Sequence, residues 1–336
     1  MILLDAIFIN NSGGKILLDY LIESLEKEDL PIHYLLDKRT EQSFKNIPTH
    51  KKTFLEGSLI KRHFFYLKNK EKFSTVLCFG NIPPSIKISA KVYTYFHQML
   101  FLDIPKNTPM FGKFIFSLKS SIVKFLTKNT NQFWVQSSLI GKKIEEKYKI
   151  SSQNICILPF FPEFKPTKEI HKIKNRFCYV SNAPDHKNHK KLLEAFEKFY
   201  LSEKKGELIV TIDENFPQLL EKVKQMKVKG IPVHNLGFVP REKLLEVYYS
   251  SDFLIYPSLS ESFGLAIAEA INCGCKVIGA DLPYMHAACE PSFTFNPLED
   301  ESIVNAFYTA INQDLPISKS KIKNNISQII EILRKS

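Results

Sequence analysis

The residues best suited to chemistry lie in the second half of the chain. Glu261 and Glu269 bracket the stretch Ser262–Leu265, which follows an apolar strand-like run and opens a helical pattern. Amide groups at a helix N-terminus bind phosphate, and a nearby carboxylate accepts hydrogen bonds from hydroxyl groups. A bare pair of glutamates is more simply one helix-start acid and one solvated side chain. The preceding strand and the glycine-containing turn favour a site for a ligand that carries both phosphate and hydroxyl groups.

A lysine in a polar loop is a second candidate for phosphate binding. Lys187 follows the apolar run that ends at Ser181 and stands where a helical pattern begins. Its ammonium group is a point charge suited to a diphosphate. A solvated basic helix start is the simpler alternative for this segment alone.

A pair of glycines near the N-terminus is the third candidate. Gly13 and Gly14 stand between the first strand-like run and a helical pattern. Glycines at such a turn let the backbone approach a ligand and leave amide donors at the helix start. The pair is explained equally well as a tight turn.

These residues are embedded in apolar runs that alternate with helical patterns, which predicts an α/β fold with parallel sheets. Strands are predicted near 2–9, 31–36, 75–79, 91–96, 132–136, 154–158, 177–181, 207–212, 233–236, 252–256, 276–279 and 293–295. Helices are predicted near 14–28, 110–128, 137–148, 188–202, 216–227, 240–250, 262–273, 299–313 and 317–334. The segment 159–176 contains three prolines and breaks the periodicity, so it predicts a linker between two Rossmann-like halves.

Length and composition exclude several classes of protein. The 336 residues suggest two domains, and 44% hydrophobic residues exclude a disordered chain. No apolar run is long enough to span a membrane. The N-terminal sequence carries Asp5 and no basic region, which predicts a core strand and not a signal peptide. The six cysteines lack metal-ligand spacing and predict buried thiols in a reducing, cytoplasmic compartment.

The net charge of +11 is unevenly distributed. Residues 1–165 contain 24 basic and 14 acidic residues, whereas residues 166–336 contain 22 and 21. A basic excess predicts a polyanionic partner, which could be nucleic acid, an anionic membrane surface or a phosphate-bearing substrate. No helix-turn-helix, zinc finger or similar motif is recognisable, so nucleic acid is disfavoured.

An amphipathic pattern over residues 110–128 lies in the basic half. Apolar residues fall on one predicted face, while Lys113 and Lys124 fall on the other and Lys119 stands at the boundary. Such a helix can lie in a membrane interface with its lysines near anionic lipids. The alternative is a helix packed in the core with a solvated basic face. The charge of this half favours peripheral docking at the inner face of the cytoplasmic membrane.

In their order along the chain, the glycine pair, the Lys187 loop and the Glu261–Glu269 segment resemble the motifs of family-4 retaining glycosyltransferases of the GT-B fold. The stretch Leu236–Pro240 also looks like the base-side loop of that family. The resemblance implies two Rossmann-like domains whose parallel sheets face each other across a cleft. The implied division is an acceptor-side domain at 1–160, a nucleotide-sugar domain at 161–316 and a C-terminal helix within 317–336 that packs back on the first domain.

The resemblance also implies a role for each candidate residue. Lys187 would contact the diphosphate, Glu261 the donor-sugar hydroxyls and Glu269 the ribose. His97, at the end of a predicted strand, would face the donor sugar, and a purely structural histidine is the alternative. Lys187, Glu261 and His97 form the implied catalytic group. The other implied donor-binding positions are Gly13, Gly14, Asn182, Asn188, Gly237, Phe238, Ser262, Phe263, Gly264 and Leu265.

The implied reaction moves a hexose or N-acetylhexosamine from a nucleotide diphosphate sugar to a glycan acceptor with retention. UDP-sugars are favoured over GDP-mannose-type donors, and a lipid-linked oligosaccharide in polysaccharide or O-antigen synthesis is the expected acceptor. No Asp-x-Asp motif is present, so neither metal ion nor cofactor is expected. The loop departs from the family where Asn182 replaces a frequent arginine, and His186 or His189 could assist instead. An inactive GT-B module that only binds sugar nucleotide or glycan is the alternative.

Overall fold

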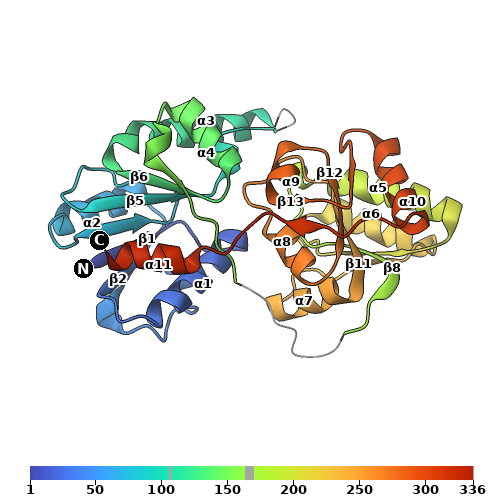
Figure 1. Cartoon of the computed structure of the whole chain (residues 1–336), viewed down its shortest axis with the longest axis horizontal. Coiled ribbons are helices and arrows are strands. Elements are labelled where there is room, and N and C mark those ends of the chain that lie inside the picture. Colours follow the sequence, from blue (N-terminus) through green and yellow to red (C-terminus); the bar gives the residue numbers. More distant parts are fainter. Residues whose placement is uncertain (106–107, 163–169, 336) are drawn as a thin grey trace. The chain divides into compact units, whose positions relative to one another are not determined.

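The computed structural model describes residues 1–105, 108–162 and 170–335, and the chain forms two compact units (Figure 1). The first unit comprises Met1–Ile104, Pro109–Pro162 and Lys323–Ser336, and the second comprises Glu163–Ile322 with Pro105–Thr108. Each unit is built on its own parallel sheet. The predicted fold class, α/β with two Rossmann-like domains, is confirmed.

The first unit contains a seven-stranded parallel sheet in the order β3-β2-β1-β4-β5-β6-β7. Its strands are β1 (Ile2–Ala6), β2 (Ile32–Asp37), β3 (Lys52–Leu55), β4 (Thr75–Cys78), β5 (Lys91–Phe96), β6 (Gln132–Val135) and β7 (Ile155–Ile157). β1 and β2 are buried along their whole length, as expected for strands covered on both faces. The chain steps one way from β1 to β3 and the other way from β4 to β7. The order therefore reverses between the neighbours β1 and β4.

Helices cover both faces of this sheet. They are α1 (Ser12–Glu26), α2 (Leu59–Asn69), α3 (Met110–Leu126), α4 (Ser138–Tyr148) and α11 (Ile326–Arg334). Parallel connections are right-handed, so α1, which leads one way along the sheet, lies on the opposite face from α2, α3 and α4. Figure 1 shows α3 and α4 on one side of the strands and α1 with α11 on the other. The Asn324 side chain before α11 donates to the Tyr20 hydroxyl of α1 at 3.1 Å.

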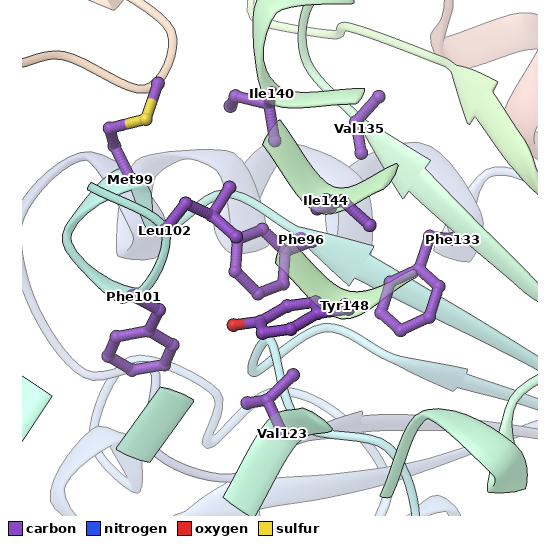
Figure 2. Close-up of a cluster of buried hydrophobic side chains, with 10 residues drawn as sticks. All are labelled: Phe96, Met99, Phe101, Leu102, Val123, Phe133, Val135, Ile140, Ile144 and Tyr148. Carbon is purple, nitrogen blue, oxygen red and sulfur yellow. The ribbon is translucent and has the colours of Figure 1, made fainter. Parts of the chain in front are cut away.

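The core beneath α3 and α4 is a cluster of large apolar side chains. Figure 2 shows Val123 of α3 below the ring of Tyr148, with Phe96 above that ring and Phe133 to its right, both from neighbouring strands. The Ser120 hydroxyl of α3 lies 3.2 Å from that of Tyr148. The face that α3 turns to the core is thus narrow.

The second unit repeats the strand order of the first. Its six parallel strands, in the order β10-β9-β8-β11-β12-β14, are β8 (Ile173–Tyr179), β9 (Glu207–Val210), β10 (Val233–Asn235), β11 (Ser251–Tyr256), β12 (Lys276–Ala280) and β14 (Phe293–Phe295). A separate antiparallel pair joins β13 (Cys289–Glu290) and β15 (Lys319–Ser320). The helices are α5 (His189–Glu203), α6 (Pro217–Val228), α7 (Arg241–Ser250), α8 (Leu265–Asn272), α9 (Pro283–Ala288) and α10 (Asp300–Asn312). Here the order reverses between β8 and β11.

The expected linker and C-terminal helix differ from the structure in their bounds, and the elements α2, α9, β3, β13 and β15 were not predicted. The predicted linker 159–176 is too long, because residues 173–176 belong to β8, while residues 163–169 lie outside the described residues. The helix expected at 317–334 begins only at Ile326, because Lys319–Ser320 pairs with β13. The chain accordingly returns to the first unit at Lys323 and not at 317.

Candidate functional site

The strand order of the second unit brings two candidate residues together. Lys187 follows β8 and Glu261 follows β11, and these strands are neighbours at the point where the order reverses. Ligands of open α/β sheets bind outside the carboxyl ends of the strands at such a point. The Lys187 ammonium group forms an ion pair with Glu261 Oε1, and the two side chains are only 16% and 11% exposed. The sequence assigned them separate roles and did not predict this contact.

Local hydrogen bonds hold the Lys187 loop in place. A short 3-10 helix, η6 (Asp185–Lys187), ends at Asn188, which has a left-handed φ of 61°. The Asn188 side-chain amide donates to the Pro297 carbonyl at 2.8 Å, and the Leu259 N–H donates to the His186 carbonyl at 2.7 Å. The loop after β8 is therefore fastened to the loop after β11. Asn188, an expected donor-binding residue, has a structural role in this loop.

Three buried tyrosines, which sequence reasoning missed, surround the ion pair. The Tyr179 hydroxyl donates to the Lys187 carbonyl at 2.8 Å, and the Tyr256 hydroxyl donates to Glu261 Oε1 at 2.7 Å. The Tyr284 hydroxyl donates to the Ser258 carbonyl at 2.7 Å. Each ring excludes water while its hydroxyl fixes one part of the site. The available signal was an aromatic residue at the last position of both β8 and β11.

The electrostatics of Glu261 follow from these contacts. Burial favours the neutral acid, but the charge and hydrogen bond of Lys187, with hydrogen bonds from Tyr256 and Ser258, outweigh it. The pKa of Glu261 is consequently lowered, and the carboxylate is ionised at neutral pH. The site thus holds one positive and one negative charge that are largely shielded from water. The Lys187 ammonium group can also pair with an anion that enters the site.

The helix after Glu261 begins later than expected. α8 starts at Leu265, so Ser262 and Phe263 precede the helix and the prediction of a start at 262 is wrong. Gly264 stands at the N-cap with φ 75°, and a Cβ there would lie 2.9 Å from Ile267 Cδ1. Only glycine fits this turn. Gly264 has no side chain that could cap the helix, so the N-cap residue offers no side-chain acceptor to the first amide groups of α8.

The remaining candidates of the second unit differ in exposure. Glu269 of α8 is only 6% exposed, and Asn182 is exposed in the loop after β8. Gly237, with φ 65°, follows β10, where Asn235 Oδ1 accepts from the Gly237 N–H at 3.2 Å. Phe238 presents an 88% exposed ring beside this turn. All of them except Glu269 lie in loops at the carboxyl ends of strands.

The two histidines that could assist Lys187 are unlike each other. His189 is fully inside the unit, with its ring centroid 4.6 Å from that of Tyr179. Burial first, and then the charge of Lys187, lower its pKa to about 3. Among the described residues neither ring nitrogen of His189 has a hydrogen-bond partner. Burial also lowers the pKa of His186, which is partly exposed and stays in the loop.

The candidates of the first unit form a second group. The strand order of this unit reverses between β1 and β4. The loop after β1 leads to Gly13 and Gly14, and His97 follows β5, the strand beside β4. A Cβ on Gly14 would lie 3.1 Å from His97 Cε1, so the imidazole is packed against the start of α1. Gly13 has no atom within 4 Å of its Cβ position.

His97 is held in one protonation state. Its backbone N–H donates to Asn81 Oδ1 at 2.6 Å, and its Nε2 lies 3.0 Å from the Phe79 carbonyl. A carbonyl only accepts, so Nε2 carries the proton and Nδ1 is left as an acceptor. Burial lowers the pKa of His97 to about 4, which keeps the ring neutral at physiological pH. The ring can therefore accept a hydrogen bond from a hydroxyl group.

The three lysines assigned to a membrane or acceptor lie elsewhere in the first unit. Lys113, Lys119 and Lys124 are exposed on α3, which is not at the strand reversal. No described helix is long and apolar enough to cross a membrane. The described residues also contain no group of three or more His, Cys, Asp or Glu placed to hold a metal ion.

Comparisons with known proteins agree with this arrangement. Residues 160–326 match the family described as Glycosyl transferases group 1. The chain is 22% identical over 258 residues to the Arabidopsis thaliana sulfoquinovosyl transferase SQD2, covering 70% of this chain and 48% of that protein. It is 24% identical over 211 residues to the Salmonella typhimurium O-antigen chain mannosyltransferase RfbU, covering 62% and 58%. The chain thus spans about half the length of these curated relatives.

A solved structure supports the fold. Anabaena Alr3699/HepE, in complex with UDP and glucose, superposes with a TM-score of 0.63 at 13% identity, covering 93% of this chain and 89% of that one. At this identity the likeness shows the fold alone. It agrees with the GT-B fold that the sequence predicted.

Proposed function

We propose that this chain is a member of the family whose model matches residues 160–326, the glycosyl transferases group 1, and that it transfers a hexose or N-acetylhexosamine from a nucleotide diphosphate sugar to a glycan acceptor with retention. The observation that carries this proposal is the ion pair of Lys187 and Glu261 at the strand reversal of the second unit. It sets a cation for phosphate and an acceptor for sugar hydroxyls side by side, next to a helix start.

The proposed reaction begins with an exchange of partners. When the donor binds, the Lys187 ammonium group leaves Glu261 for the diphosphate, and the released carboxylate accepts hydrogen bonds from the sugar. The bond between the anomeric carbon and the phosphate oxygen then breaks, and the acceptor oxygen bonds to that carbon on the same face. The acceptor proton passes to the departing phosphate. Lys187 and the uncapped start of α8 stabilise the charge that grows on this leaving group.

The other site residues have supporting roles in the proposal. Glu269 binds the ribose, and the loop of Gly237 and Phe238 lies on the base side. His97 Nδ1 accepts from a sugar hydroxyl, and Gly14 permits the close approach of that ring to α1. The reaction needs no metal ion or cofactor in this scheme, which predicts that a chelator leaves the rate of transfer unchanged.

Donor and acceptor are proposed from the relatives. UDP is favoured because the Anabaena structure holds UDP and glucose, whereas the Salmonella relative is named as a mannosyltransferase, which keeps GDP-mannose as a second candidate donor. An oligosaccharide carried on a lipid diphosphate is the proposed acceptor, since the Salmonella relative is named as an O-antigen chain mannosyltransferase.

A thermal-shift panel of UDP- and GDP-sugars tests this function. A ligand at 100 times its dissociation constant adds about 2.7 kcal/mol of stability, so the true donor raises the melting temperature clearly. Lys187→Ala should reduce that shift by about half or more, because tenfold weaker binding lowers the added stability to about 1.4 kcal/mol. Lys190→Ala, which removes an exposed lysine at the start of α5, should keep the full shift. No shift with any nucleotide sugar would contradict the proposal. A shift without turnover on any glycan would favour a module that binds but does not transfer.

A further inference from the structure

Helix α3 of the first unit turns its apolar side away from the core. Phe114, Leu118 and Phe125 are 67%, 52% and 68% exposed, although they share one helical face. The residues that it buries are Ser120, Val123 and Leu126 (Figure 2 shows Val123). An apolar stripe of this size on a protein surface marks an interaction site. The apolar face of α3 therefore does not pack in the core of the unit, and we expect a partner to cover it.

The charges around this stripe indicate what covers it. At 100° per residue, Lys113 and Lys124 border the stripe on one side and Lys119 borders it on the other. α3 contains no Asp or Glu. Among the described residues no ion pair involves Lys119 or Lys124. An apolar stripe with basic borders is complementary to a bilayer that carries anionic headgroups, where the stripe enters the acyl boundary and the lysines meet phosphates.

A hollow lies at the C-terminal end of the same helix. It has a volume of about 280 Å³ and is lined by Thr127, Lys128, Thr130, Asn131, Lys149 and Ser151, among others, with no acidic residue. No hydrogen bond or ion pair within the described part of the chain engages the Lys128 or Lys149 ammonium groups. Such a cavity suits a phosphate group, because lysine ammonium groups donate to it and no carboxylate repels it.

The hollow and the stripe are continuous. The Lys128 ammonium group lies 4.4 Å from the ring centroid of Phe125, the last exposed aromatic residue of the stripe. Lys128 thus borders both surfaces. A lipid whose acyl chains lie along Phe125 would have its headgroup beside Lys128.

From these observations we propose that α3 docks the protein on an anionic membrane, and that the hollow at its end binds the phosphate headgroup of one lipid. This surface shares no residue with the proposed nucleotide-sugar site, so the inference stands or falls independently of the transfer reaction. It assigns different tasks to the lysines: Lys119 and Lys124 meet the membrane surface at large, and Lys128 and Lys149 meet one headgroup.

Co-sedimentation of the full chain with vesicles tests the proposal. Wild type should bind phosphatidylcholine vesicles that contain about a third phosphatidylglycerol, should release in high salt, and should not bind pure phosphatidylcholine. Lys128→Glu with Lys149→Glu should weaken binding at least about 30-fold, at about 1 kcal/mol per lysine near the surface. The matched control is Lys27→Glu with Lys45→Glu, which makes the same change in net charge away from α3 and should cost less than about threefold.

The apolar stripe needs its own variants. Phe114→Ser with Phe125→Ser should weaken vesicle binding at least about tenfold while leaving the melting temperature near that of wild type, because both rings are exposed. Equal losses in the charge variant and its control would overturn the headgroup site. Unchanged binding of the Phe variant would overturn insertion of the stripe.

Two further outcomes would contradict a lipid as the occupant. Binding of soluble glycerol phosphate that Lys128→Glu with Lys149→Glu abolishes, together with vesicle binding that the same variant leaves unchanged, would assign the hollow to a free phosphate compound. A concentration-dependent dimer that Phe114→Ser abolishes, with no vesicle binding by wild type, would assign the stripe to a second copy of the chain.

Discussion

The two units have the same strand order but differ in what stands where that order reverses. In the second unit the neighbours β8 and β11 lead to Lys187 and Glu261, a buried ion pair among tyrosine rings. In the first unit β1 and β4 stand at the reversal, and the candidate ligand-binding groups near them are neutral, with Gly14 packed against the ring of His97. The charged pair there, Asp5 of β1 with Arg62 of α2, is only 1% and 3% exposed and is sealed in the core. One topology has thus produced a charged and an uncharged site.

The excess of basic residues lies in the first half of the chain, away from the half that contains the Lys187–Glu261 ion pair. The first half of the chain carries the basic excess and the exposed stripe of α3, while the second half is nearly neutral. A few charges that are shielded from water act more strongly than many charges on an open surface, where water and salt screen them. The comparison teaches that net charge points to the surface partner. A buried ion pair points to the chemistry where it stays partly exposed, as Lys187 and Glu261 do, and to packing where it is sealed, as Asp5 and Arg62 are.

The largest predicted effect is on the charged site. Lys187→Ala should lower turnover by about 10² to 10³, because a donor aimed at the leaving group is lost. Initial rates of transfer, measured beside Lys190→Ala, check this. Near-normal transfer by the Lys187 variant would show that the charged reversal is not the reacting centre.

A smaller effect separates positioning from chemistry. Tyr256→Phe keeps the ring but removes the hydrogen bond to Glu261, and it should lower kcat about tenfold with little change in the KM of the donor. The matched control is Tyr200→Phe on α5, which should change neither constant. A rise in KM alone would assign Tyr256 to donor binding.

At the strand reversal of the first unit we predict an effect on the free energy of unfolding that comes from side-chain packing. Alanine is favoured over glycine in a helix, so Gly13→Ala, with open space around its Cβ, should raise the free energy of unfolding. Gly14→Ala must displace His97 and should be less stable than Gly13→Ala by about 1 kcal/mol. Equal stability of the two variants by urea unfolding would show that the contact with His97 is loose.

The smallest effect is a pH dependence of stability. Because the folded protein lowers the pKa of Glu261, this carboxylate stabilises the fold above its ordinary value of 4.5, and the contribution is lost as the pH falls through the folded value. Glu261→Gln lacks this term, and comparison with wild type cancels most of the contribution of the buried histidines. Melting temperatures of the two proteins should therefore converge below pH 4.5, and a constant difference would contradict a paired carboxylate.

Local patterns predicted most of the parallel strands because these are short apolar runs, but they missed β3, a half-buried edge strand that begins with a lysine. Local sequence patterns could not predict contacts between residues that are far apart along the chain. Helix α2 was missed because its core-facing residues include Arg62, which is buried through its bond of 2.7 Å to Asp5, 57 residues earlier. A search for apolar periodicity cannot find a helix whose core side carries an arginine.

The candidate site was predicted residue by residue but not as an arrangement. The sequence located Lys187 and Glu261, yet their ion pair depends on β8 and β11 being neighbours, which the order of the chain does not reveal. In the same way, the spacing over 110–128 predicted helix α3 and its two sides. It could not show that Ser120 faces the core and Phe114 faces outward, because that depends on the neighbouring helix and strands.

The most direct test of the central claim is a calorimetric titration of UDP, with GDP in parallel, into wild type, Lys187→Ala and Glu261→Gln. If Lys187 exchanges Glu261 for the diphosphate, Lys187→Ala should bind the nucleotide at least about tenfold more weakly. Glu261→Gln should bind it more tightly than wild type, since the competing and repelling carboxylate is gone, although transfer is lost. Equal affinities in all three proteins would contradict the exchange and the placement of the diphosphate at this site.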